Sequence, residues 1–168
     1  MNSATALNEF QRIERFLFDP ANWKPVLLTR EWAKLQPEDA GVYMLFENGK
    51  PVYVGESGSI SGRVSDMLDS RHHSVRRSLG EMRFSMITDY VKASSKSKHP
   101  EHIETLIVQI MQSFKLSVLP IKIGRKEFEE YVFEKHNPEL NRKAKRGSSG
   151  QTQNLRPEQH MLPEARMR

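Results

Sequence analysis

Apolar side chains recur through much of the chain at a spacing of three or four residues, which places them on one face of a helix. The first such stretch, 5–18, ends at Asp19 and Pro20, where proline stops the helix. Thr29 and Ser59 each precede another apolar segment and belong to the residue types that cap helix N-termini. The predicted helices are 5–18, 30–35, 60–68, 74–82, 102–114 and 126–136.

Three other stretches have the composition of β-strands. Residues 41–46 and 51–56 flank an Asn-Gly dipeptide, which is typical of a tight hairpin turn. The third stretch, 116–123, contains Pro120. Because proline has no N–H for the hydrogen-bond ladder, this strand is predicted to lie at the edge of a sheet.

The register of the hairpin decides whether its two tyrosines, Tyr43 and Tyr53, share a face of the sheet. A two-residue turn at Asn48 and Gly49 places the two phenols on opposite faces. A three-residue loop of Glu47, Asn48 and Gly49, with Gly49 in the left-handed region, places them side by side with Cβ atoms about 5 Å apart. Local turn chemistry permits both registers.

Composition limits the class of protein. With 168 residues and 37% hydrophobic content, the chain is expected to form one core. It contains no cysteine, which excludes disulfides and thiolate zinc sites and favours an intracellular protein. The N-terminus lacks the pattern of a signal peptide, and no apolar run is long enough to span a membrane. We expect a soluble, cytoplasmic protein.

The net charge of +5 is unevenly distributed. Residues 142–168 carry seven Lys or Arg and two Glu, whereas 1–141 is formally neutral. Within the neutral part, 63–98 holds eight basic and four acidic residues, and such a patch suits nucleic acid. A solvated loop and tail explain the same charges equally well. The candidates for contact with phosphates are Arg71, Arg76, Arg77, Lys143, Lys145 and Arg146.

One carboxylate falls on the apolar side of the last predicted helix. At 100° per residue, Glu129 lies in the arc formed by Phe128, Val132 and Phe133. A carboxylate on a buried face is costly unless it is paired or binds a cation. The alternative is a glutamate at the rim of the helix, where the N-terminal dipole favours it.

An ordered set of residues resembles the motifs of the GIY-YIG nuclease family. A Gly-x-Tyr and a Tyr-x-Gly ten residues later are followed by an arginine on the next helix, then a glutamate and a Pro-x-x-Asn. The similarity covers roughly 40–141, with an insertion before the third strand. The residues that carry it are Gly41, Tyr43, Tyr53, Gly55, Arg63, Glu129, Pro138 and Asn141.

The resemblance implies an α+β fold with a small three-stranded antiparallel sheet flanked by helices. It also implies a protein that hydrolyses phosphodiesters with one divalent metal, Mg²⁺ or Mn²⁺. It implies that Glu129 is the only protein ligand of the metal. Tyr43 and Tyr53 would order the attacking water and act as, or assist, the general base. Arg63 would bind the scissile phosphate, and Asn141 would tie down the end of the glutamate helix.

These roles agree with the chemistry of the side chains. A guanidinium offers a fork of donors where negative charge develops in the transition state. A single carboxylate leaves Mg²⁺ most of its shell for water and phosphate oxygens. Since the tyrosines would act together, we predict the three-residue loop with Gly49 left-handed.

The chain departs from the common family pattern at two positions. Where many relatives have a tyrosine or histidine one turn after the arginine, this chain has Met67, which cannot move a proton. His72 and His73 are the candidates to replace it, with His73 slightly favoured because it adjoins a predicted helix start. Alternatively, both are surface histidines that contact phosphate without a role in catalysis.

The second departure is Glu56, which stands where many relatives have a lysine. A carboxylate beside a polyanion is unfavourable unless it is paired. We expect Arg63 or Arg71 as its partner.

The predicted organisation is an N-terminal helical arm (1–39), a nuclease domain (40–141) with a helical insertion at about 70–115, and a basic, disordered tail (142–168). The leading hypothesis is a restriction-type DNA endonuclease. A homodimer would explain double-strand cuts, and RNA is left open as a substrate. There are two alternatives: a non-catalytic nucleic-acid-binding module on the same fold, and a stand-alone single-strand or structure-specific nuclease. A partner-binding protein is a weaker third hypothesis.

Overall fold

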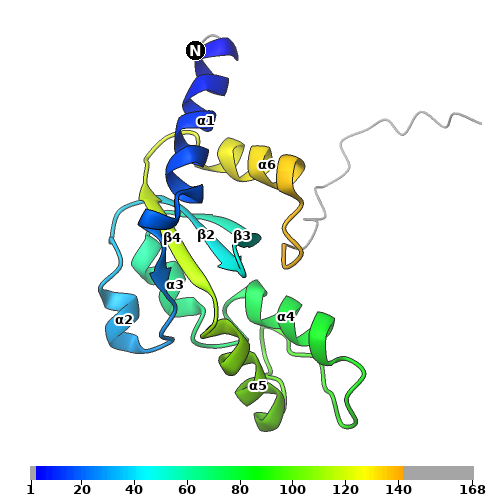
Figure 1. The fold of residues 1–168 in the computed structure, drawn as a ribbon. Helices are drawn as coiled ribbons and strands as arrows, with labels where there is room; N and C mark the ends of the chain where they lie inside the picture. The colour runs from blue at the N-terminus through cyan, green and yellow to red at the C-terminus, as the bar shows by residue number, and fades with distance from the viewer. Residues whose placement is uncertain (1–2, 142–168) are drawn as a thin grey trace, which may run out of the picture.

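The computed structural model describes residues 3–141 and forms a mixed α/β fold around one antiparallel sheet (Figure 1). The predicted helices and strands are all present, with ends that differ by a few residues. In chain order the elements are α1 (Ser3–Phe18), the 3₁₀ helix η1 (Pro20–Asn22), β1 (Lys24–Pro25), α2 (Arg30–Lys34), β2 (Gly41–Glu47), β3 (Lys50–Ser57), α3 (Ile60–Asp66), α4 (Ser74–Phe84), α5 (Glu101–Met111), β4 (Lys115–Pro120) and α6 (Arg125–His136).

Side-chain oxygens begin the short helices as the sequence predicts. Thr29 Oγ1 accepts a hydrogen bond of 3.1 Å from the backbone N–H of Trp32 at the start of α2. Ser59 Oγ does the same for Gly62 in α3, also at 3.1 Å. These bonds satisfy backbone donors that the first turn of a helix leaves without partners.

The strand order in the sheet is β1-β4-β2-β3, with every pair antiparallel. The sheet therefore has four strands, not three, because the two-residue β1 pairs with the start of β4. No periodicity could predict a strand of two residues. β1 covers only Lys115 and Leu116, so the rest of β4 lies at the sheet edge, and Pro120 sits at its end opposite Gly41.

The two faces of the central strand β2 belong to two separate cores. Tyr43 and Leu45 face a cluster that includes side chains of α3, α4 and α5. Val42, Met44 and Phe46 face a second cluster formed with α1 and α6. Figure 1 shows α1 and α6 on one side of the sheet and α3, α4 and α5 on the other. Alternation along one strand thus separates the tyrosine side from the α6 side.

The hairpin turn differs from the predicted three-residue loop. Asn48 and Gly49 both have positive φ, 50° and 79°, and Glu47 pairs with Lys50, so the turn has two residues. Only the left-handed conformation of Gly49 was predicted correctly. Asn and Gly are the residue types that tolerate this conformation best, which is why the tighter turn forms.

A β-bulge returns the two tyrosines to one face of the sheet, but in a register that differs from both registers considered in the sequence analysis. The pairing shifts between Leu45 and Phe46, so that Val52 is an extra residue in β3. Tyr43 then lies opposite Gly55, and Tyr53 lies opposite Leu45. Because the shift is one residue, Tyr53 turns to the same face as Tyr43.

The glycine of the Tyr-x-Gly motif has a steric role. The Tyr43 ring lies directly over Gly55, and a Cβ added there would overlap its Cζ and Oη atoms. The two tyrosine rings stack with centroids 5.9 Å apart. Gly55 therefore provides the space that Tyr43 needs beside Tyr53.

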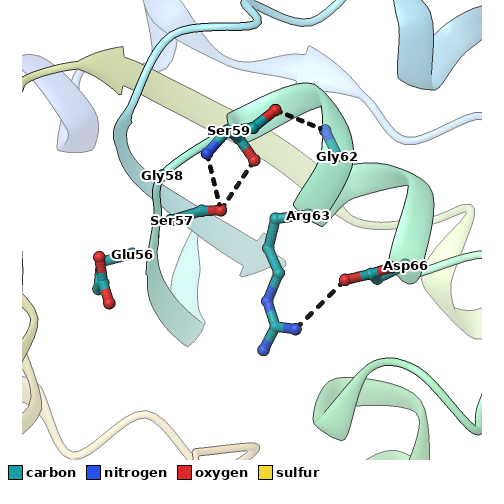
Figure 2. A pocket seen from close by; sticks show the side chains of 7 residues that line it. All are labelled: Glu56, Ser57, Gly58, Ser59, Gly62, Arg63 and Asp66. Carbon is teal, nitrogen blue, oxygen red and sulfur yellow. Dashed lines mark hydrogen bonds and ion pairs between the residues drawn. The ribbon is translucent and has the colours of Figure 1, made fainter.

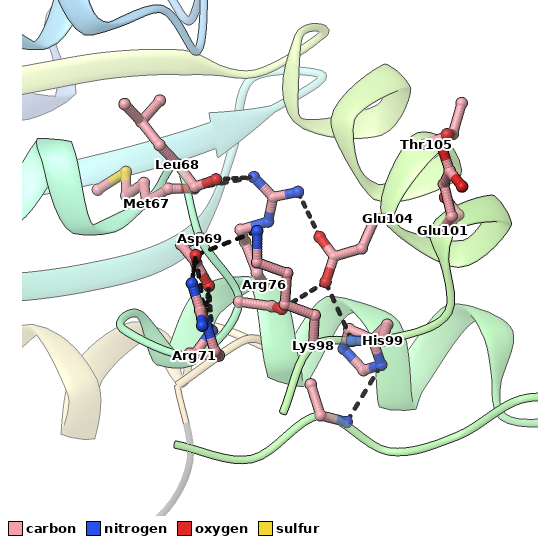
Figure 3. A network of polar contacts seen from close by, with 12 residues as sticks. Met67, Leu68, Asp69, Arg71, Arg76, Lys98, His99, Glu101, Glu104 and Thr105 are labelled. Carbon is pink, nitrogen blue, oxygen red and sulfur yellow. Dashed lines mark hydrogen bonds and ion pairs between the residues drawn. The ribbon is translucent and has the colours of Figure 1, made fainter. Parts of the chain in front are cut away.

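A buried ion pair fixes the insertion that contains α4 and α5 (Figure 3). The Arg76 guanidinium donates to the carbonyl oxygens of Met67 and Leu68 at 3.2 and 3.0 Å and pairs with Glu104 of α5 at 2.6 Å. Glu104 also accepts hydrogen bonds from Ser70 Oγ and from the His99 backbone N–H. The Arg76 side chain is 5% exposed, so in this structure it is held inside the fold and not on the surface where the predicted contact with phosphate would form.

Replacing Gly49 by alanine should destabilise the fold by about 1 kcal/mol, because an L-residue at φ 79° is strained. Gly58→Ala is the matched control, since its Cβ would also enter open space but its φ lies outside the left-handed region. Urea unfolding should show a loss for Gly49→Ala and none for Gly58→Ala. Equal effects would contradict the two-residue turn.

Glu104→Gln should lower the free energy of unfolding by roughly 2 to 4 kcal/mol, because it leaves the buried Arg76 charge without its counter-ion. Glu101→Gln removes the same charge from an exposed position of the same helix. It should change the stability by less than about 1 kcal/mol. The comparison is made by chemical denaturation, and a similar loss in both variants would show that the ion pair does not hold the insertion.

Candidate active site

A surface pocket of about 560 Å³ lies where β3 runs into α3 (Figure 2). The turn that leads into the helix is held by Ser57, whose Oγ donates to Ser59 O at 2.8 Å and accepts from Ser59 N at 3.1 Å. Arg63 lies one turn into α3, and its guanidinium extends into the pocket beside Asp66. The residues that line the pocket are Glu56, Ser57, Gly58, Ser59, Gly62, Arg63 and Asp66.

Arg63 joins the pocket to the tyrosine pair. Its ion pair with Asp66 is long, 3.4 Å, and its side chain is 32% exposed. Its positive charge also acts on both Tyr43 and Tyr53. The guanidinium therefore lies between the buried phenols and the open pocket, where five N–H donors can serve both sides.

The N-terminus of α4 meets the two phenols from the opposite side. His73 Nε2 lies 2.9 Å from Tyr43 Oη, and Ser74 Oγ lies 3.2 Å from Tyr53 Oη. His73 is fully buried, whereas His72 is exposed, so the structure brings only the first of the two histidines to the tyrosines. Sequence reasoning missed Ser74, although its position after His73 at the helix start was a usable signal.

Burial dominates the protonation of this group. It raises the pKa of Tyr43 well above the usual 10, with Tyr53 adding to the rise and Arg63 opposing it. It lowers the pKa of His73 well below the usual 6.5, with smaller contributions from the charges of Arg63 and Arg77. Both groups are therefore neutral at neutral pH.

Glu129 lies on α6, which packs on the other face of the sheet through Phe128 and Val132. It is half-buried, whereas Glu130 and Glu134 are exposed, in agreement with the predicted arc. Glu129 follows Arg125 by four residues, so the two share one side of the helix. Arg125 reaches Glu56 in the pocket lining, which places that side of α6 next to the pocket.

The pairing of Glu56 differs from the expectation. Its partner is Arg125, at 3.1 Å from Oε2, and not Arg63 or Arg71. Arg71 instead pairs with Asp69 at 2.7 Å. The partner of Glu56 comes from an element about 70 residues away, and sequence spacing alone could not indicate it.

The donor set determines which metal these residues could hold. Among the described residues, no three or more His, Cys, Asp or Glu side chains are grouped as a metal site. A single carboxylate from Glu129 fits a hard cation that keeps most of its waters, such as Mg²⁺, and does not fit zinc, which needs several protein ligands.

Asn141 binds the free edge of β3 as a neighbouring strand would. Its Oδ1 accepts from Val54 N at 2.9 Å, and its Nδ2 donates to Val54 O at 2.8 Å. The adjacent Leu140 N donates to the carbonyl of Val52, the bulge residue, at 2.9 Å. The segment after α6 is thus attached to the strand that carries Tyr53.

Among the remaining predicted nucleic-acid contacts, the structure describes Arg77. Arg77 donates to the carbonyl oxygens of Ser70 and Arg71 at 3.0 and 2.8 Å. The predicted tail, which includes Lys143, Lys145 and Arg146, lies outside the described residues. No helix in the part of the chain that the structure describes is long and apolar enough to cross a membrane.

The chain is similar in structure to the GIY-YIG N-terminal endonuclease domain of UvrC from Thermotoga maritima. The magnesium-bound form of that domain has 19% sequence identity and a TM-score of 0.36, and the match covers 67% of this chain and 94% of that one. A point mutant bound to its catalytic divalent cation has 19% identity and a TM-score of 0.37, with 67% and 93% covered. No protein family and no curated protein matches the sequence.

The stability of the fold should fall on acidification from about pH 7 to pH 5. The lowered pKa of His73 means that the unfolded chain takes up a proton near pH 6.5 that the folded chain does not. The stability from the neutral ring is complete above that pH and is lost below it, by up to about 1.4 kcal/mol per pH unit. Urea unfolding across this range should give a steeper pH dependence for wild type than for His73→Gln.

His72→Gln is the control for that measurement, because it removes an exposed histidine next to the buried one. It should keep the wild-type pH dependence. If His73→Gln keeps it too, the buried ring is not its source.

Proposed function

We propose that this chain is a metal-dependent endonuclease that hydrolyses phosphodiester bonds in DNA. One observation supports the proposal above all others. Side chains from two strands, a helix and a helix N-terminus meet at one buried site, which consists of Tyr43, Tyr53, Arg63 and His73, and Arg63 also lines the adjoining pocket. A buried cluster of titratable groups with shifted pKa values beside an open pocket is typical of a catalytic site.

Arg63 binds the scissile phosphate in this proposal. Its guanidinium reaches into the pocket, where a phosphate oxygen can accept two of its N–H groups. Negative charge grows on the phosphorus oxygens during attack, so these hydrogen bonds strengthen in the transition state. Tyr43 and Tyr53, on the inner side of Arg63, orient the attacking water and act as, or assist, the general base.

Glu129 is the proposed ligand of a divalent metal, Mg²⁺ or Mn²⁺. The metal would supply Lewis-acid stabilisation of the phosphate charge. Glu129 stands on the side of α6 that faces the pocket, as the contact of Arg125 with Glu56 indicates. Asn141 supports this placement because it joins the chain just after α6 to β3.

The two departures from the family pattern are compatible with catalysis. Met67 is fully buried in the core, and His73 from the next helix contacts Tyr43 instead. The charge of Glu56 is offset by Arg125, so it does not stand unpaired beside a phosphate. A non-catalytic binding module on the same fold is therefore the weaker alternative.

The proposal includes a restriction-type role as a homodimer. In the insertion, about 70–115, the Arg76 and Glu104 pair joins α4 to α5, and this insertion is the candidate for target recognition. A single-strand or structure-specific nuclease, acting on DNA or RNA, is the second candidate. The ends of the cleavage products distinguish the two.

Glu129→Gln should reduce cleavage of plasmid DNA in Mg²⁺ or Mn²⁺ by at least about 100-fold, because it removes the metal-binding carboxylate while keeping the size of the side chain. Binding of DNA without metal should be unchanged. Glu134→Gln is the control, since it neutralises an exposed glutamate of the same helix and should cut like wild type.

Wild-type cleavage by Glu129→Gln would refute the assignment of the metal site. DNA binding that falls with salt, with no cleavage by wild type in any divalent metal, would instead identify a binding module. Discrete plasmid fragments would support the restriction-type role. Scattered nicks, or cutting of single-stranded DNA or RNA alone, would support the second candidate.

A further inference from the structure

The two ring nitrogens of His73 have different and fixed partners. Nδ1 lies 3.1 Å from the backbone nitrogen of Val75 and caps the first turn of α4. A backbone N–H can only donate, so Nδ1 must present its lone pair and carries no proton. The proton of the neutral ring is therefore on Nε2.

Nε2 faces Tyr43 Oη at 2.9 Å. Because Nε2 holds the proton, His73 is the donor in this bond and the phenol oxygen is the acceptor. In this tautomer Nε2 has no lone pair with which to take the proton of Tyr43. Moving the ring proton to Nδ1 would break the bond to Val75 and leave that N–H buried without a partner, since Val75 and His73 are both fully buried.

The surroundings of the ring favour the same state. The charged or titratable groups that face it are Tyr43 from β2, Tyr53 from β3, Arg63 from α3 and Arg77 from α4. None of them is a carboxylate, and both arginines disfavour a second proton on the imidazole. The neutral ring with one proton is thus stabilised by burial and by its neighbours.

Tyr43 Oη consequently accepts a hydrogen bond from His73 Nε2–H at the start of α4. The positive charge of Arg63 acts on the same phenol from α3. A phenol oxygen that accepts from His73 cannot give its own proton to that ring. A preorganised donor and a cation near one oxygen are the arrangement that stabilises an oxyanion, here a phenolate.

We propose that His73 acts on Tyr43 as a hydrogen-bond donor, held in that tautomer by the first turn of α4, and not as a proton acceptor. His73 is then a positioning residue that selects Tyr43 as the base. This inference rests on the proposed function only for its catalytic consequence. The tautomer itself follows from the contacts of the folded chain.

The proton transfer balances without His73 gaining or losing a proton. The reactive form is the small fraction of Tyr43 that has lost its proton to solvent water, which grows as the pH rises. An O–H bond of the attacking water then breaks, its proton forms a new O–H bond with the phenolate, and the oxygen forms the bond to phosphorus. The bond from phosphorus to the leaving oxygen breaks with its electron pair, and that oxygen takes a proton from solvent.

The tautomer is tested directly by nitrogen NMR on the full chain labelled with ¹⁵N-histidine. The His73 signals are identified by their loss in His73→Gln. From about pH 6 to pH 8, Nε2 should be the protonated nitrogen and Nδ1 the unprotonated one. A proton on Nδ1, alone or together with one on Nε2, overturns the proposal. This measurement needs no substrate, so it gives a result even if the chain is not a nuclease.

The catalytic consequence is tested with two substitutions. In His73→Gln the amide nitrogen occupies the place of Nε2 and donates, but it cannot take up a proton, whereas His73→Leu can do neither. The glutamine variant should keep kcat within about tenfold of wild type. In the leucine variant kcat should fall by about 100-fold or more, and KM should be unchanged in both. Unfolding curves measure the loss of the helix cap separately.

The pH profile separates the donor role from a structural one. With Tyr43 as base, the cleavage rate should rise with pH through the neutral range in wild type and in His73→Gln alike. Two outcomes would make His73 a proton acceptor and overturn the inference. One is equal inactivation of the glutamine and leucine variants in folded protein, and the other is loss of the pH-dependent rise in rate in His73→Gln. Absence of cleavage in wild type would refute the proposed function and leave the NMR result standing.

Discussion

The candidate site depends on one extra residue in β3. The Asn48–Gly49 turn is the tightest that the sequence allows, and by itself it would direct Tyr43 and Tyr53 to opposite faces of the sheet. The bulge at Val52 reverses that outcome and sends Tyr53 into the core that already holds Tyr43. The bulge is secured from outside the hairpin, because the Val52 carbonyl accepts a hydrogen bond from Leu140.

Once the phenols share a face, the elements that cover this face determine their chemistry. α3 brings a cation from the pocket side, and the start of α4 brings a neutral imidazole and a hydroxyl from the other. The position of α4 depends in turn on Arg76, whose buried pair with Glu104 fixes the helix to α5 and to the end of α3. An arginine that contacts no substrate in our proposal thus maintains the geometry of the site.

The sequence predicted most of the elements and part of the site. Periodicity identified the six helices, and residue type identified the caps Thr29 and Ser59, because both signals are local. The place of His73 beside Tyr43 could only be suspected, since 30 residues separate the two. The partner of Glu56 and the burial of Arg76 had no local signal at all. For Ser74 the only signal was its place at a helix start, which does not indicate a contact with Tyr53.

The sequence by itself determined three features: the order of the strands and helices, the left-handed glycine of the turn, and the apolar side of the helix that carries Glu129. Each of these depends only on residues that are close in the sequence. Only the tertiary structure decided the register of the hairpin. The local turn energy and the burial of Tyr53 favoured different registers, and a bulge satisfies both. The protonation of His73 was decided in the same way, since an unprotonated Nδ1 requires the folded start of α4 and a neutral ring requires burial.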